Sequence, residues 1–156
     1  MKQLLFILLF PTLLGSSFSG YSQKRVLMHE LQVKTSFIYY ESKLFNGIGY
    51  SVYENGKLSE EISYQEGKKE GLNTEWYDNG IPRLKQHWRD GLMQGKVIGW
   101  YENGEKEYIG QYESYDWYDS WEWRDAKEKV GLWKYYHENG QLKEEKNFKE
   151  GVEMKK

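Results

Sequence analysis

The chain has 156 residues, with 22 Lys and Arg against 24 Asp and Glu, so its length fits about one domain. The net charge of −2 gives no reason to expect a nucleic-acid or anionic-membrane partner. The absence of cysteine excludes disulfide scaffolds, structural zinc ribbons and thiol nucleophiles. Aromatic residues make up 17% of the chain and alanine occurs once, at Ala126. Because helices use much Ala and half-buried strands favour Tyr and Trp, the composition predicts an all-β domain.

Residues 1–22 show the ordered features of a secretory signal peptide. Lys2 precedes an apolar run of about 11 residues, and small residues follow it up to Ser22. The run is shorter than the roughly 20 residues that cross a bilayer, so we expect no membrane span in the mature chain. The alternative is a buried N-terminal strand or helix. We expect cleavage between Ser22 and Gln23 and an exported protein, periplasmic or extracellular.

Residues 23–38 precede the regular part of the sequence. Their apolar residues fit either a strand or a short helix, and periodicity does not decide between them. Repeat arrays need a terminal segment that covers their first exposed edge. We therefore interpret 23–38 as an N-terminal capping segment, and residues 39–156 as a repeat domain.

The repeat domain is built on a period of 24 residues. Its units start near Gly47, Gly71, Gly95 and Gly131, the last step being 24 plus 12 residues. An aromatic ring or His, an acid, Asn and Gly follow in every unit, and another ring stands 17 residues after each start. The turn pairs are Asn55-Gly56, Asn79-Gly80, Asn103-Gly104 and Asn139-Gly140, and the later rings are Tyr64, Trp88, Tyr112 and Phe148. Tyr40 falls in the same register, as part of a preceding half unit.

Each unit is interpreted as a β-hairpin. Asn-Gly between alternating apolar residues is the strongest short hairpin signal, because both residues tolerate a positive φ. One hairpin alone is marginal in water, so several must stack. We expect an elongated antiparallel meander of stacked hairpins in a single-layer sheet, with the rings aligned one per unit on one face.

The pattern Gly-x-x-x-x-aromatic-Tyr-Glu-Asn-Gly-x-Leu resembles the MORN repeat in its bacterial variant form, over Tyr39 to Gly151. The resemblance implies a meander of antiparallel hairpins with a binding or scaffold role and no catalytic residues. Some relatives are labelled antitoxins of toxin–antitoxin systems. The chain departs from the pattern at Pro82, at Tyr115 and in its 12 extra residues. Pro82 cannot donate to a sheet ladder, which predicts a bulge or a strand start there.

The 12 extra residues lie in an aromatic and acidic insertion, about 113–128. A single added strand would reverse the meander, so the insertion must hold an even number of strands or form a loop. Three interpretations stay open: its rings cover a neighbouring sheet face, bind a protein partner, or bind a glycan. The candidate binding residues are Tyr115, Trp117, Tyr118, Trp121 and Trp123.

The remaining sequence carries little chemistry. His29, His87 and His137 show no metal-type spacing, and the acids before each Asn-Gly pair fit turn chemistry better than a calcium or acid–base site. We expect no catalytic residue, no metal and no cofactor. The hypothesis is an exported, non-catalytic scaffold for protein–protein interaction. The alternatives are an antitoxin-like or immunity protein, and a glycan-binding module.

Overall fold

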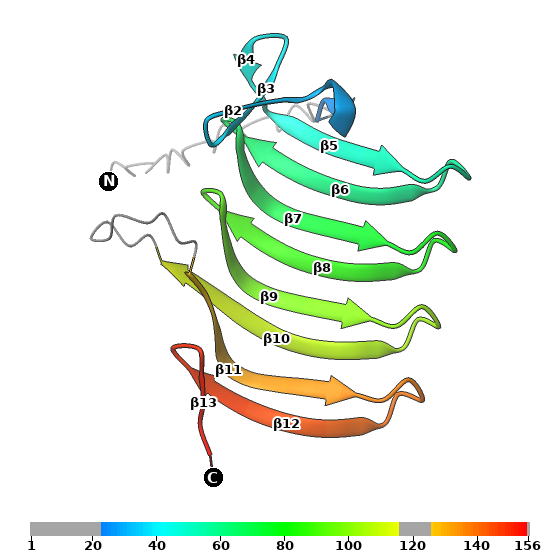
Figure 1. Cartoon of the computed structure of the whole chain (residues 1–156), viewed down its shortest axis with the longest axis vertical. Coiled ribbons are helices and arrows are strands. Elements are labelled where there is room, and N and C mark those ends of the chain that lie inside the picture. Colours follow the sequence, from blue (N-terminus) through cyan, green and yellow to red (C-terminus); the bar gives the residue numbers. More distant parts are fainter. Residues whose placement is uncertain (1–22, 116–125, 156) are drawn as a thin grey trace, which may run out of the picture.

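A computed structural model describes residues 23–115 and 126–155, most of which form one long, open sheet (Figure 1). Its ten strands follow the order β1-β5-β6-β7-β8-β9-β10-β11-β12-β13. Every pair is antiparallel except β1 with β5. The predicted all-β meander of stacked hairpins is therefore confirmed. The strands of the repeats are β5 (Gly47–Val52), β6 (Leu58–Gln65), β7 (Lys68–Trp76), β8 (Pro82–Arg89), β9 (Leu92–Trp100), β10 (Lys106–Tyr115), β11 (Ala126–Tyr136), β12 (Leu142–Lys149) and β13 (Val152–Glu153).

The Asn-Gly turns differ from the prediction in their geometry. Gly56 has a φ of +79°, but Asn55 does not have a positive φ, and the same holds in the other three units. The amide of Gly56 donates to the carbonyl of Tyr53 at 2.9 Å, which closes a turn one residue longer than expected. A register shift follows between Ser51 and Val52, as in a three-residue hairpin loop with a bulge. In this longer turn the side-chain oxygen of Asn55 accepts a hydrogen bond from the Lys57 amide at 2.9 Å.

Two-residue turns with both φ values positive connect the strands at their other ends, opposite the Asn-Gly turns. Glu66 and Gly67 have φ values of +49° and +75°, and Asp90-Gly91 and Glu150-Gly151 follow the same pattern. Such turns match the twist of the strands they join. Units one, two and four therefore alternate an Asn-Gly turn with an acid–Gly turn.

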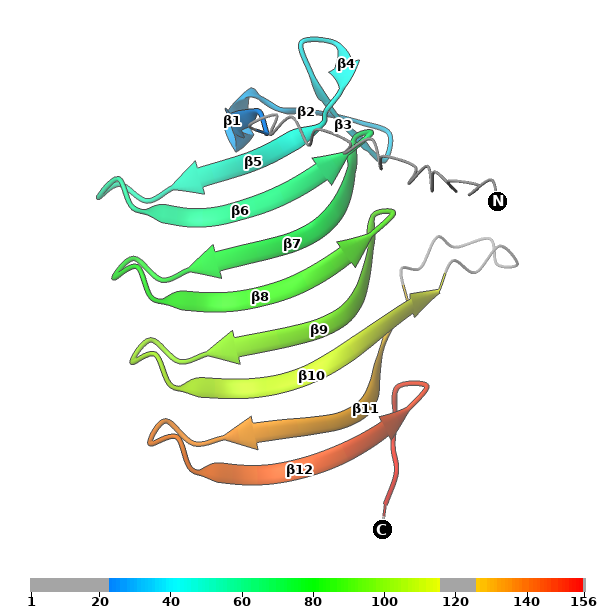
Figure 2. The same ribbon diagram turned by 180° about the vertical axis from the view of Figure 1, so that it is seen from behind.

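The first glycine of each later unit produces a bulge. Gly71, Gly95 and Gly131 have φ values of +89°, +94° and +65°. Opposite each of them the strand register shifts, for example between Ile62 and Tyr64. Bulges bend a strand and increase its twist. The result is visible in Figure 2, where β7, β9 and β11 curve strongly near their start.

The strand register places the predicted rings on one face of the sheet. Tyr64 pairs with Gly47, and Trp88, Tyr112 and Phe148 pair with the equivalent glycines. Side chains two residues apart share a face, so further rings join them there. We call this the aromatic face; its rings are Tyr64, Trp88, Tyr108, Tyr112, Trp133, Tyr135 and Phe148.

The N-terminal segment covers the first edge of the sheet. Strand β1 (Arg25–Leu27) pairs with β5, and a short 3₁₀ helix, η1 (Met28–Glu30), follows. Val26, Phe45, Ile62 and Tyr64 form a buried cluster, with Met28, Leu31, Ile38 and Tyr40 packed against it. An added Cβ on Gly49 would lie 3.0 Å from the Leu31 side chain, so the cap packs directly on the aromatic face of unit one.

The expected half unit around Tyr40 does not join the long sheet. β2 (Gln32–Lys34), β3 (Phe37–Tyr40) and β4 (Lys43–Leu44) instead form a separate three-stranded sheet, which we call the cap sheet. Strand β1 takes the place beside β5 that the half unit would have filled. Tyr40 still keeps its ring register, because it contacts Phe45, which in turn contacts Tyr64 at 5.7 Å between ring centroids.

Strands β10 and β11, which flank the insertion, pair over a longer stretch than the strands of the first unit. Tyr112 pairs with Lys129, as Tyr64 pairs with Lys69 in the first unit, and the pairs from Glu113–Glu128 to Tyr115–Ala126 continue outward. Both strands grow together, so the chain re-enters the sheet in its original direction. Unit four therefore stacks like the units before it.

Candidate functional site

Two ladders of hydrogen bonds run along the Asn-Gly edge and hold the units in a fixed relation. The hydroxyls of Tyr53, Tyr77 and Tyr101 each donate to a backbone carbonyl of the next unit, at 2.5, 2.7 and 2.9 Å. The amides of Asn55, Asn79 and Asn103 do the same at 2.9, 3.0 and 2.8 Å. Hydrogen bonds between neighbouring units replace the deep core that a single-layer sheet lacks. These bonds fix the positions of neighbouring units, and with them the strands that bear the aromatic face.

The rings of the aromatic face gather most densely in units three and four. Trp133 is 1% exposed, and its ring lies between Tyr112 and Phe148, at centroid distances of 5.0 and 6.2 Å. Tyr108 and Tyr135, which pair with each other across β10 and β11, lie 6.0 and 6.1 Å from it. A Cβ on Gly110 would collide with the Trp133 ring, so glycine is required for the ring to cross that strand. The five rings form one packed cluster.

A lysine ammonium lies against this cluster. The Lys129 Nζ is 4.4 Å from the centroid of Trp133, 5.4 Å from Tyr135 and 5.3 Å from Phe148. It also donates to the Tyr135 hydroxyl at 2.8 Å. The negative ring faces attract the cation. In unit two, Lys69 takes the equivalent position, 4.3 Å from the centroid of Trp88.

The middle of the aromatic face is polar. Glu60 and Glu75 lie directly opposite each other on β6 and β7, and Arg83 forms an ion pair with Glu75. Burial, and secondly the charge of Glu75, raises the pKa of the Glu60 carboxyl above its usual range. Next to this pair, Asn73 is 1% exposed and its Oδ1 has no hydrogen-bond partner. These residues place hydrogen-bonding groups on β6, β7 and β8, beside the rings of units one and two.

Burial alters the phenols of the aromatic face. It raises the pKa of Tyr64 to about 12, with the Glu60 charge adding to the effect. It also raises the pKa of Tyr108 and of Tyr112. These phenols therefore stay neutral at physiological pH, which suits packing and hydrogen bonding rather than acid–base chemistry.

Of the five insertion residues predicted from the sequence, Tyr115 is the one that the structure describes. Tyr115 ends β10, where it pairs with Ala126. Trp117, Tyr118, Trp121 and Trp123 lie outside the described residues. Their role as a binding surface stays a prediction.

The sequence interpretation missed three members of the aromatic face: Tyr108, Trp133 and Tyr135. It identified the ring that recurs 17 residues after each unit start, because that ring obeys the period. The missed rings stand where other units carry different residues, such as Val97 in place of Trp133. The alternation Gly131, Trp133, Tyr135 was the signal that would have placed them on the same face as Phe148.

Among residues 23–115 and 126–155, no group of three His, Asp or Glu side chains is arranged to hold a metal ion. No helix in the same ranges is long and apolar enough to cross a bilayer.

Comparison with known proteins links the repeats to a family. Three segments match the model of the MORN repeat variant, at residues 45–66, 93–114 and 129–150. They correspond to units one, three and four, whereas unit two, which contains Pro82 in its second strand, is not matched. No curated protein and no solved structure matches the chain. MORN repeats commonly act as non-catalytic modules that bind proteins or membranes. Three of the units in this meander of hairpins are therefore MORN repeats of the variant form.

Proposed function

We propose that this chain is an exported, non-catalytic scaffold that binds a protein partner through its aromatic face. One observation carries the proposal: from unit two onward, no other described element packs on this face, although every unit contributes rings to it. The cap covers only the portion in unit one. Aromatic rings that a monomer leaves half-buried on an open surface are typical of interfaces.

The dimensions of the face suit a macromolecule. It crosses eight strands, β5 to β12, and neighbouring strands lie about 4.8 Å apart, so it is about 34 Å long. Its rings alternate with charged side chains of both signs, including Lys129, Arg83, Glu60 and Glu75. A mixed aromatic and charged surface of this length fits the standard protein–protein interface better than a small-molecule site.

The proposal has two further parts, export from the cytoplasm and a second contact made by the insertion. The ordered features of residues 1–22 support secretion, and the rings of Trp117, Tyr118, Trp121 and Trp123 in the sequence support a second contact in the segment that follows β10. Attaching residues 1–22 to a reporter enzyme tests the first point. We expect the reporter outside the cytoplasm and cleavage after Ser22; an uncleaved cytoplasmic reporter would contradict export.

Binding is tested by stoichiometric capture from secreted and envelope fractions with residues 23–156. Trp88→Ala and Tyr135→Ala remove rings from the aromatic face, and Trp100→Ala, on the opposite face of the sheet, is the matched control. We expect capture of one protein to fall at least tenfold for the first two variants and to persist for the control. Equal capture by all three would contradict the proposed face. Capture of polysaccharide alone would favour the glycan-binding alternative, and a captured toxin that the chain inhibits would favour the immunity role.

A further inference from the structure

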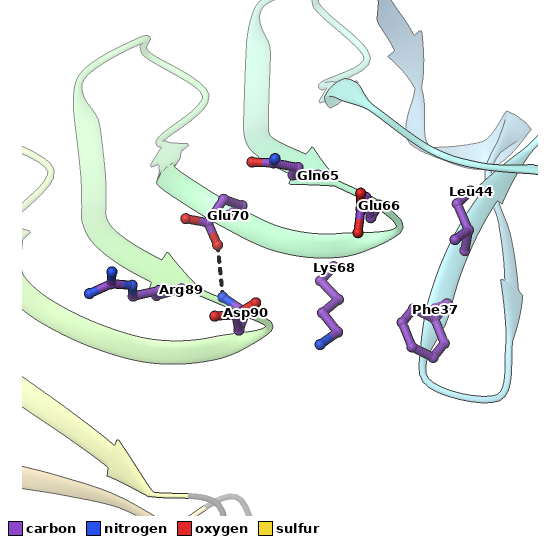
Figure 3. Close-up of a pocket in the computed structure, with 8 residues that line it drawn as sticks. All are labelled: Phe37, Leu44, Gln65, Glu66, Lys68, Glu70, Arg89 and Asp90. Atoms are coloured by element: carbon purple, nitrogen blue, oxygen red, sulfur yellow. Dashed lines mark hydrogen bonds between the residues drawn. The ribbon is translucent and has the colours of Figure 1, made fainter.

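The cap sheet and the acid–Gly turns of units one and two together line a groove (Figure 3). It has a volume of about 510 Å³, which lies in the usual range for ligand sites. Gln65, Lys68 and Arg89 alternate along their strands with Tyr64, Lys69 and Trp88, so the groove opens on the face opposite the aromatic face. Its lining residues are Phe37, Leu44, Gln65, Glu66, Lys68, Glu70, Arg89 and Asp90.

Backbone hydrogen bonds fix the wall of the groove that the cap sheet supplies. The Ile38 amide donates to the Gly67 carbonyl at 2.8 Å, and the Gly67 amide donates to the Phe45 carbonyl at 2.9 Å. The Glu66 amide donates to Asn46 Oδ1 at 2.9 Å. A Cβ on Gly67 would lie 2.7 Å from the Ile38 carbonyl oxygen, so only glycine allows this close approach. The wall is therefore formed before any ligand arrives.

The second turn is held in a similar way. The Gly91 amide donates to the Lys69 carbonyl at 2.9 Å, and the Asp90 amide donates to Glu70 Oε2 at 2.7 Å. Figure 3 shows this bond beside Lys68, whose side chain extends into the groove between Asp90 and Phe37. Both turns are thus preorganised, which lowers the entropic cost of binding.

The lining has an apolar end and a charged end. Phe37 and Leu44 form the apolar end, and Leu44 is 41% exposed. The Lys68 Nζ is 5.8 Å from the Phe37 centroid, and Asp90 and Arg89 follow along the groove. Lys68 and Arg89 form no ion pair with another described residue. Along the groove, the lining therefore changes from apolar to cationic at Lys68, then to anionic at Asp90 and to cationic again at Arg89.

We propose that this groove binds a short peptide segment in which an apolar side chain is followed by an acidic and then a basic residue. The apolar side chain would pack on Phe37 and Leu44, its acidic neighbour would face Lys68, and the basic residue would face Asp90. Peptide amides would find partners in the Gln65 amide and in the carboxylates. Polyanions such as nucleotides suit the groove poorly, because three carboxylates, Glu66, Glu70 and Asp90, line it.

This site is separate from the aromatic face and does not depend on it. The repeats alone do not create it: the apolar wall comes from the cap sheet, which among the described residues is hydrogen-bonded through its backbone to the Gly67 turn of unit one. A departure from the repeat pattern thus supplies a site that the other units lack. Loss of partner capture through the aromatic face would leave this proposal intact, and the reverse also holds.

The test uses ¹⁵N-labelled residues 23–156 titrated with end-blocked pentapeptides and followed by amide chemical shifts. The probes are Gly-Leu-Glu-Lys-Gly and its reverse, Gly-Lys-Glu-Leu-Gly, because the groove can be entered from either end. Control peptides replace Leu by Ser or exchange Glu and Lys. We expect saturable shifts at the amides of Leu44, Lys68 and Asp90, and about tenfold weaker binding of the Ser peptide, since burial of a leucine side chain is lost.

Two variants connect the binding to the groove. Leu44→Ser should weaken the favoured peptide about tenfold, whereas Leu142→Ser, at a leucine that is 51% exposed in unit four, should leave its affinity unchanged. Lys68→Gln should abolish the preference for Glu over Lys beside the anchor. Peptide shifts that are absent at millimolar concentration, or that occur away from the groove, would overturn the proposal. Equal binding of the Leu and Ser peptides would overturn it as well.

Discussion

The hydroxyl of Tyr77 donates a hydrogen bond to the backbone carbonyl of Trp100, 23 residues further along the chain, at 2.7 Å. Tyr53 and Tyr101 make the same bond to the units that follow them. In unit four the tyrosine is replaced by His137. The phenol thus occurs in the three units that have a described following unit to bind, which explains its period in the sequence as an inter-unit contact.

Replacing Tyr77 by Phe should lower the free energy of unfolding by about 1 kcal/mol, because a part-buried hydrogen bond is lost while the ring remains. Urea denaturation monitored by tryptophan fluorescence gives the change. Tyr50→Phe is the control, since its hydroxyl makes no hydrogen bond to a described residue, and it should change stability by less than about 0.5 kcal/mol. Equal effects of the two substitutions would show that the ladder bond does not hold the units together.

The asparagine ladder allows a similar comparison within one residue type. Asn79 accepts from the Ile81 amide at 2.8 Å and donates to the Glu102 carbonyl of the next unit at 3.0 Å. Asn139 accepts from the Gln141 amide at 3.0 Å, but its donor group contacts only the Gln141 side chain. Asn79→Ala should therefore destabilise the chain by about 0.5–1 kcal/mol more than Asn139→Ala. Thermal or urea unfolding of both variants measures the difference, and a zero difference would assign the asparagines to their own turns alone.

Gly110 is the least replaceable residue beneath the aromatic cluster. Gly110→Ala places a methyl group inside the Trp133 ring, and overpacking of this kind should cost about 3 kcal/mol. Unit three has Val97 at the position of Trp133, which shows that a smaller side chain fits the repeat. Gly110→Ala combined with Trp133→Val should therefore be less destabilised than the sum of the two single changes. Additive effects would mean that the two residues do not press on each other.

The sequence predicted those parts of the fold that repeat. The period placed Tyr64, Trp88, Tyr112 and Phe148 on one face, and strand pairing bears this out. It placed the Asn-Gly turns correctly but missed their loop length, because the hairpin preference of the dipeptide is compatible with more than one loop length. The longer loop is favoured in the structure by asparagine bonds to the next unit, which local sequence signals do not contain.

The remainder depends on long-range contacts that break the period. Nothing in residues 37–44 indicates that they leave the long sheet, because their rings keep the repeat register while β1 takes the edge of β5. The groove beside Leu44 follows from that exchange, so it was invisible in the sequence. The position of Trp133 was not predicted for a related reason: its ring packs over Gly110, which belongs to another unit.

Glu60 should make stability depend on pH in a direction opposite to that of an ion-paired carboxylate. Burial and the facing Glu75 raise its pKa in the folded state above the ordinary value of 4.5, so the folded chain binds more protons than the unfolded chain around and above that pH. The contribution of Glu60 is thus greatest below about pH 4.5 and declines as the pH rises through the raised pKa. Glu60→Gln removes the charge but keeps the shape. We expect the variant to gain stability relative to the parent chain as the pH increases from 4 to 7, measured by urea unfolding at each pH. If the free energies of unfolding of the variant and the parent chain differ by the same amount at every pH, Glu60 is hydrated and its pKa is not raised in the folded state.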